Sequence, residues 1–220
     1  MFIFPAPSVL NAFCSLFSPY STKLGWETIV MDLPYKRIIT QSRWPKFMGW
    51  QHPRVQESCE MVMYVDSNFR PVKWVKPKHL LNFAAKVRDS EVGFSFREHN
   101  LDRTISEEWA AIVEVKKDTP EHVQAAQEWM QQQPDYKDDA QLWELPFFFY
   151  NPLSEKFREL TGFFWSRYSL ELDSWRDQPL MAYSVHHVGV TPYSLSNRAP
   201  FFKRDSKAEG FNGHTYITSQ

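Results

Sequence analysis

Four apolar runs dominate the first third of the chain. They occupy residues 1–4 (MFIF), 12–17 (AFCSLF), 27–33 (ETIVMDL) and 60–65 (EMVMYV), and their Val, Tyr and Phe content favours strands. The runs are continuous rather than alternating, which is typical of strands covered on both faces, as in parallel sheets. We therefore predict a buried, mostly parallel sheet.

The rest of the chain shows helical periodicity, interrupted by strand-like runs at residues 92–96 and 145–150. The predicted helices cover residues 78–87, 103–115, 119–132, 151–164 and 176–189. Their expected end signals are Thr104 with Glu107, Thr119 with Pro120, Asn151 with Pro152, and Gly189. In the fourth helix Leu153, Phe157, Leu160 and Phe164 should share one face.

Strands alternating with helices predict an α/β/α sandwich around a central sheet. We expect one domain over residues 1–205, followed by a polar tail or linker over residues 206–220. The sequence contains neither a GxGxxG nor a GxxxxGK[ST] segment, so a Rossmann dinucleotide site and a P-loop are not supported.

Composition narrows the class of protein. The 220 residues carry a net charge of -1 and are 43% hydrophobic, which suits a substantial core but not a dedicated nucleic-acid binder. Cys14 and Cys59 form no CxxC pair, and we interpret them as buried thiols in a reducing compartment. The apolar start lacks a basic region and is interrupted by prolines, and no run has the ~20 apolar residues of a membrane span. We expect a soluble, cytoplasmic monomer.

The stretch YVDSN places Asp66, Ser67 and Asn68 directly after the strongest predicted strand. Ligands of open parallel sheets bind beyond the carboxyl ends of the strands. Mg²⁺ and Mn²⁺ take one or two carboxylates together with substrate phosphate oxygens, so Asp66 and Asn68 suit a metal bound to a diphosphate. By itself, however, this composition favours a simple turn.

Two cations precede this strand. Arg43 and Lys46 lie three residues apart, a spacing that puts both on one face of a helix, with His52 and Pro53 beyond them. They could hold the phosphates or ribose of a nucleotide, Arg as a fork and Lys as a point charge. A solvated basic face is an equal alternative.

Two later segments are rich in polar groups. Residues 97–108 include His99 and Arg103, and residues 176–178 are Arg176, Asp177 and Gln178. Asp177 could cap the helix that Pro179 begins, or act near a reacting centre as a base or an electrostatic stabiliser. We take His99, Arg103 and Gln178 as candidates for binding a sugar or an acceptor.

His186 and His187 lie late in the last predicted helix. Neighbouring residues on a helix point about 100° apart, so at most one of them should face a site. A buried, hydrogen-bonded histidine is the usual role, and an additional ligand to a metal held by Asp66 is the functional alternative.

These segments occur in an order that resembles GT-A fold glycosyltransferases. The order is Arg43 and Lys46, then YVDSN, then FREHNLDRTISEEW and finally WRDQP. The resemblance covers residues 1 to about 205, and is greatest to the N-terminal glycosyltransferase domain of a chlorella-virus-encoded protein involved in capsid-protein glycosylation.

This resemblance implies a UDP-sugar donor, Mn²⁺ or Mg²⁺, and transfer of a hexose or deoxyhexose to a hydroxyl of a glycan or glycoprotein acceptor. Asp66 would bind the metal or donor, and Asn68 replaces a second aspartate. The missing carboxylate leaves room for His186 or His187. The base would lie beside Pro5, Ala6 and Pro7, and Asp177 with Arg176 near the sugar. No residue stands out as a dedicated base, which favours retention of configuration.

Two other functions remain open. A carbohydrate-binding module would use the Trp and Phe residues for stacking and would need no metal. A glycoside hydrolase would need two carboxylates facing each other across the sugar. Asp66 and Asp177 would have to fill those roles, which leaves Arg43 and Lys46 unexplained.

Overall fold

The central strand of the main sheet is buried on both faces, which explains its unbroken apolar sequence. The computed structural model describes residues 2–5, 13–14, 26–27, 31–66, 68–195 and 201–204, with the backbone alone for the first three stretches. In strand β7 (Trp143–Tyr150), Phe148 joins the larger core cluster, whereas Phe147 and Phe149 join a second cluster on the opposite face. Continuous hydrophobicity here reports burial on two faces.

Strands and helices are interspersed along the chain. The other strands are β1 (Phe2–Pro5), β2 (Phe13–Cys14), β3 (Trp26–Glu27), β4 (Cys59–Val65), β5 (Phe69–Pro71), β6 (Phe94–Glu98), β8 (Tyr193–Leu195) and β9 (Phe202–Arg204). The helices are α1 (Ile38–Phe47), the short 3-10 helix η2 (Gly49–Gln51), α2 (Pro53–Ser58), α3 (Pro77–Arg88), α4 (Ile105–Glu114), α5 (Pro120–Gln131), α6 (Glu155–Tyr168) and α7 (Asp177–Val188). The predicted α/β class is confirmed.

The main sheet has the order β1-β4-β7-β6-β8. Strand β7 is antiparallel to both β4 and β6, β1 is antiparallel to β4, and within this sheet only β6 and β8 are described as a parallel pair. A separate two-stranded sheet pairs β2 with β3 in parallel. The main sheet is therefore mixed, and the expectation of mostly parallel pairing does not hold. An apolar run shows that both faces are covered, but it carries no information on strand direction.

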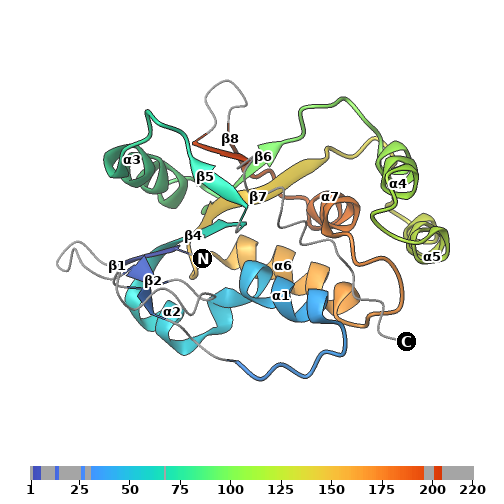
Figure 1. The fold of residues 1–220 in the computed structure, drawn as a ribbon, viewed down its shortest axis with the longest axis horizontal. Helices are drawn as coiled ribbons and strands as arrows, with labels where there is room; N and C mark the ends of the chain where they lie inside the picture. The colour runs from blue at the N-terminus through green and yellow to red at the C-terminus, as the bar shows by residue number, and fades with distance from the viewer. Residues whose placement is uncertain are drawn as a thin grey trace.

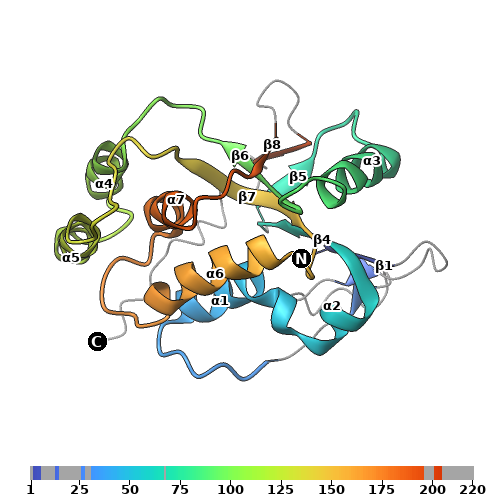
Figure 2. The same cartoon turned by 180° about the vertical axis from the view of Figure 1, so that it is seen from behind.

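Helices cover both faces of this sheet. Figures 1 and 2 show α1, α2 and α6 on one side and α3 on the other, with α4 and α5 beyond α7. The larger core cluster lies under the first group, where Phe47, Phe157 and Phe164 are fully buried. The smaller cluster lies between the sheet and α3, and includes Ala84 and Val87. The result is a single domain with a three-layer arrangement.

Several predicted helix ends are confirmed. The Thr104 side chain accepts a hydrogen bond from the Glu107 amide, while the Glu107 side chain accepts one from the Thr104 amide. The Thr119 side chain accepts from the His122 amide. Helix α7 ends at Gly189, whose φ of 70° is the left-handed conformation that glycine adopts without steric cost.

Other predicted features differ. Helix α6 is capped by Ser154, not Asn151, because the Ser154 side chain accepts from the Phe157 amide. Asn151 instead accepts from the Leu153 amide in a turn before the helix, and Leu153 is 58% exposed. The predicted strand over residues 27–33 is not one continuous strand, since β3 ends at Glu27 and residues 31–33 are irregular.

Two further features concern the limits of the domain. No helix in the described ranges is long and apolar enough to cross a membrane. Residues 205–220 lie outside the description, so the boundary expected after residue 205 stays a prediction. Cys59 is a buried thiol that forms no disulfide and donates to the carbonyl of Arg54 at 3.8 Å, and its burial is as expected.

Candidate functional site

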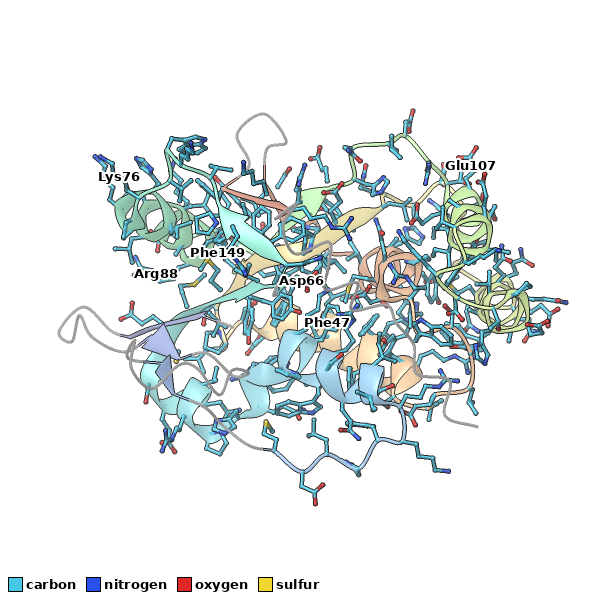
Figure 3. The ribbon with its side chains drawn as sticks, in the orientation of Figure 1. Phe47, Asp66, Lys76, Arg88, Glu107 and Phe149 are labelled. Carbon is cyan, nitrogen blue, oxygen red and sulfur yellow. The ribbon has the colours of Figure 1, made fainter. Side chains whose placement is uncertain are left out.

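Asp66 lies directly beyond the carboxyl end of β4, as the sequence predicted. Its amide donates to the carbonyl of Pro146 in β7 at 2.7 Å, which fixes it against the sheet, and the Phe69 amide donates to the Asp66 carbonyl at 3.0 Å. The predicted turn is therefore present. The carboxylate is half-buried and accepts a hydrogen bond from the Tyr64 hydroxyl at 2.7 Å. Figure 3 shows Asp66 in the middle of the molecule, near Phe47 of α1.

Helix α1 brings Arg43 and Lys46 to this part of the molecule. Lys46 is 2% exposed, and its ammonium lies 5.1 Å from the ring centroid of Phe47 and 5.3 Å from that of Tyr64. These distances are within the range of cation–π attraction. The two cations do share one side of a helix, but that side is buried, so the alternative of a solvated basic face is wrong.

Asp177 joins both cations from the other end of the chain. Its Oδ2 lies 2.8 Å from the Lys46 Nζ and 3.2 Å from the Arg43 Nε. Asp177 is the first residue of α7, and the N-cap position is Arg176, which makes no side-chain cap. The interpretation of Asp177 as a helix cap is therefore wrong, because its carboxylate turns toward α1.

The charges around Asp177 fix its protonation. Burial alone would raise the pKa of Asp177, but Arg43, Lys46 and Arg176 outweigh burial and hold that pKa well below its ordinary value. Burial lowers the pKa of Lys46, and the charges of Asp177 and Asp66 oppose this shift. We treat the contact between Lys46 and Asp177 as an ionised pair, because each buried charge has its partner at 2.8 Å.

Two buried tyrosines border this cluster of charges. Burial raises the pKa of Tyr64, and the carboxylate of Asp66 raises it further, so this hydroxyl stays protonated and donates to Asp66. Burial also raises the pKa of Tyr168, whose hydroxyl donates to the carbonyl of Trp175 at 2.7 Å. Tyr168 thereby holds the loop that leads into Arg176 and α7.

Three buried N–H donors around Asp177 lack an acceptor among the described residues. They are the Nε atoms of Arg43 and Arg176 and the Nε2 atom of Gln178. For Arg43 the 3.2 Å approach to Asp177 is an ion pair without the alignment of a hydrogen bond. Buried donors without acceptors are costly, and they suit a ligand rich in acceptor oxygens.

The residues fit a shared metal site rather than a protein cage. Among the described residues, no group of three or more His, Cys, Asp or Glu side chains could hold a metal ion. For such a site Asp66 would supply one carboxylate and Asn68, half-buried two residues later, one amide oxygen. Mg²⁺-type sites commonly use one or two carboxylates and complete their shell with water and substrate phosphates. Such a cation would need a diphosphate to hold it here.

The described contacts of His187 lie elsewhere than at Asp66. His187 is near the far end of α7, about 15 Å along the helix axis from Asp177 at 1.5 Å per residue. Nδ1 of His187 lies 2.7 Å from Oδ2 of Asp135, and its ring stacks on Phe163 with centroids 4.0 Å apart. The metal role expected of His186 or His187 stays a prediction.

The three predicted sugar-binding residues separate in the structure. Gln178 adjoins Asp177 on α7. Arg103 forms an ion pair with Glu108 at 3.1 Å. His99 contacts the backbone of Leu101 and follows β6, which extends about four residues further along β7 than β4 does, or roughly 13 Å. Of the three, only Gln178 adjoins the cluster in sequence, and its role in sugar binding stays a prediction.

Some predicted positions fall outside this description. Ala6, Pro7 and Ser67 are not among the described residues, and Pro5 is described only as the backbone of β1. The predictions for a base-binding segment therefore remain predictions.

The sequence reasoning missed Tyr64 as a site residue. The signal was present, because residues two apart in a strand point to the same face, and this places Tyr64 beside Asp66. The involvement of Tyr168 had no comparable local signal, since it depends on the packing of α6.

Comparisons with models of protein families, with curated proteins and with solved structures found no match.

Proposed function

We propose that this chain is a metal-dependent glycosyltransferase that moves a hexose or deoxyhexose from a UDP-sugar to a hydroxyl of a glycan acceptor. The proposal combines the resemblance of the sequence segments to GT-A enzymes with the arrangement of charges at the end of β4. A role in viral capsid-protein glycosylation rests on the resemblance alone.

The observation that carries the proposal is the convergence of three distant segments. Arg43 and Lys46 come from α1, Asp66 from the end of β4, and Asp177 from the start of α7. Lys46 links them, because it is bound to Asp177 and feels the charge of Asp66. A carboxylate at a strand end beside fixed cations is the pattern that a metal-bound diphosphate requires.

The cations would act on the leaving group. When the glycosidic bond breaks, negative charge develops on the nucleoside diphosphate, and fixed positive groups stabilise that charge without reorganising. The four charges of Arg43, Lys46, Asp66 and Asp177 cancel, so Arg176 gives the cluster a net positive charge. A bound divalent cation would supply further charge stabilisation at the diphosphate.

Asp177 serves as a positioning residue in this account, rather than as a base. Its carboxylate is 8% exposed, ion-paired to two cations and ionised because its pKa is low. A general base works best with a pKa near the operating pH. Asp177 instead holds Arg43 and Lys46 in place, which agrees with the expected absence of a dedicated base and with retention of configuration.

The competing functions fit these residues less well. A retaining or inverting hydrolase needs a protonated acid beside the sugar, whereas the pKa of Asp177 is lowered. A carbohydrate-binding module gives no reason to bury two cations and a carboxylate below the end of β4. The transferase accounts for both features.

The test is a panel of nucleotide sugars incubated with the protein in Mn²⁺ or in EDTA. We expect the protein to release the nucleoside diphosphate from at least one UDP-sugar in Mn²⁺ but not in EDTA. The variant Asp66→Ala should lose this release. The control Asp139→Ala, which removes an exposed carboxylate elsewhere on the surface, should retain it. Absence of both hydrolysis and binding for every donor would refute the proposal. Metal-independent binding of a free sugar would favour the module.

A further inference from the structure

A strongly basic surface lies on β5, on β9 and on the segment that leads into α3. Residues 70–80 and 201–204 contain six cations and no acidic residue, in a chain whose overall net charge is -1. The cations are Arg70, Lys73, Lys76, Lys78, Lys203 and Arg204, and all six are exposed. The chain thus concentrates positive charge on one face while remaining near neutral overall.

Strand pairing brings the two segments together. Strands β5 and β9 are antiparallel, with Arg70 opposite Lys203 and Phe69 opposite Arg204. Phe202 is 2% exposed and anchors β9 in the core between the sheet and α3. This pairing places the side chains of two basic residues, Arg70 and Lys203, next to each other on neighbouring strands.

Trp74 adds a fixed aromatic surface to these cations. It lies in the turn after β5 and is 48% exposed. Its ring packs against Phe201 and His79, with centroids 6.0 Å and 5.7 Å away. His79 is itself held by a hydrogen bond from the Lys76 amide at 3.2 Å. A large aromatic side chain that is held in place yet half-exposed is preorganised for stacking, with little entropy left to lose on binding.

The lysines around Trp74 form no ion pair with another described residue. Within the part of the chain that the structure describes, no ion pair involves Lys73, Lys76, Lys78 or Lys203. These residues therefore present uncompensated charge to a partner. Attraction of this kind is long-ranged at low salt and is screened over about 10 Å at 0.1 M salt.

The chain connects this surface to the candidate site. Strand β5 begins directly after Asn68, and an extended chain limits the distance from Asp66 to Trp74 to about 29 Å. Burial and the charge of Arg176 lower the pKa of Lys117, and Arg204 and Arg103 add to this shift while Glu108 opposes it. Figure 3 shows Lys76 at the outer end of α3, away from Asp66.

We propose that Trp74 and the cations Arg70, Lys73, Lys76, Lys78 and Lys203, together called the basic face, bind an anionic glycan chain whose end is the acceptor. The aromatic ring stacks on a sugar ring, and the cations bind carboxylate, sulfate or phosphate groups along the chain. This inference rests on the proposed transferase function for its identification of the acceptor. It assigns the acceptor to a chemical class, which is a negatively charged oligosaccharide rather than a neutral or single sugar.

Other anionic partners fit less well. Proteins that bind single-stranded nucleic acid stack successive bases on several aromatic side chains, whereas the basic face has one exposed tryptophan. Stable attachment to a membrane surface requires inserted apolar groups in addition to basic charge, and Trp74 is packed against Phe201 and His79.

The experiment is calorimetric titration of the protein with oligogalacturonate, without nucleotide or metal, at low and high salt. We expect binding at low salt that weakens at least about tenfold at high salt, because the contact is mainly ionic. Two variants should each weaken the binding of oligogalacturonate about tenfold or more. One is Trp74→Ala, and the other is the triple variant Lys73→Glu, Lys76→Glu and Lys203→Glu. The charge-matched control changes Lys36, Lys86 and Lys137, all exposed, to Glu, and should retain binding.

Each alternative outcome overturns the proposal. A neutral maltooligosaccharide that binds as tightly as oligogalacturonate would overturn it. So would single-stranded DNA or phosphatidylserine vesicles that bind more tightly than oligogalacturonate at equal charge. The third such outcome is a loss of oligogalacturonate binding in the control triple variant as large as that in the variant of the basic face. The donor test with Asp66→Ala is independent. Oligogalacturonate binding without donor turnover would refute the transferase and leave the basic face as a glycan-binding surface.

Discussion

The molecule uses cations in two contrasting ways. Arg43 and Lys46 lie inside, next to Asp177, and their positions are set by ion pairs and by ring contacts. Lys73 and Lys76 lie outside, on the basic face, with no ion pair among the described residues. The first pair is held between a carboxylate and aromatic rings, whereas the second pair is exposed and has no described ion pair.

The difference shows that buried and exposed cations can contribute to binding in different ways. Taking a charge out of water costs several kcal/mol, so a buried cation persists only with a partner, and it is then fixed in position. Such a cation can stabilise charge that develops in a reaction. An exposed lysine costs little, and contributes attraction rather than geometry. The buried pair suits the reacting end of a substrate, and the basic face suits the remainder of it.

The largest expected effect is that of removing the carboxylate from the buried cluster. Asp177→Ala leaves Lys46 and Arg43 buried without their counter-charge, and should lower the free energy of unfolding by about 3–5 kcal/mol. Urea denaturation measures this change. The control is Asp139→Ala at an exposed position. A loss below about 1 kcal/mol would show that Asp177 does not hold the cluster together, and would remove the contrast with the basic face.

Replacing both Lys46 and Asp177 should lower the free energy of unfolding by less than the sum of the two single replacements. The double variant Lys46→Met with Asp177→Leu replaces two buried charges with apolar groups, and Arg43 at 18% exposure can turn toward solvent. A double-mutant cycle should give a coupling of about 1–3 kcal/mol. Additive losses would mean that Lys46 and Asp177 act on stability independently.

The cluster should also respond to acid in a defined window. The pKa of Asp177 is lowered in the folded state, so its stabilising contribution is complete above the unfolded carboxyl pKa of about 3.9 and is lost as the pH falls below that value. The difference in unfolding free energy between the natural protein and Asp177→Asn should therefore be constant from pH 8 to 5 and shrink below about pH 4. A difference that stays constant into strong acid would contradict the lowered pKa.

The smallest expected effect on stability belongs to the basic face. Lys73→Ala with Lys76→Ala should change the free energy of unfolding by no more than about 0.5 kcal/mol, because exposed side chains without ion pairs contribute little. The same urea denaturation measures it. A loss of unfolding free energy as large as that of Asp177→Ala would mean that these lysines stabilise the fold. The contrast between the buried cluster and the basic face would then be wrong.

Local signals in the sequence predicted much of the secondary structure and the position of Asp66. The Thr104 cap, the Gly189 helix end and the strand before Asp66 each depend on neighbouring residues, and each was found where expected. Strand direction was not predictable in this way. An apolar run records burial on both faces, which β7 has in an antiparallel setting.

The site shows the same limit. Residues 46 and 177 are 131 positions apart, and no local pattern indicates that their side chains meet. Asp177 was interpreted as a helix cap because Asp before Pro is a common start, yet the opposing cations of α1 determine where its carboxylate turns. His187 was proposed as a metal ligand from its chemistry alone, and the length of α7 places it about 15 Å from Asp177.

The most direct test of the central claim is thermal denaturation with UDP, with and without Mn²⁺. Because a ligand that binds only the folded state raises its stability, UDP with Mn²⁺ should raise the melting temperature of the natural protein and of Asp139→Ala. Asp66→Ala should fold normally and show no shift. Stabilisation of Asp66→Ala equal to that of the natural protein, or no shift with any nucleoside diphosphate in any variant, would contradict a metal and donor site at the end of β4.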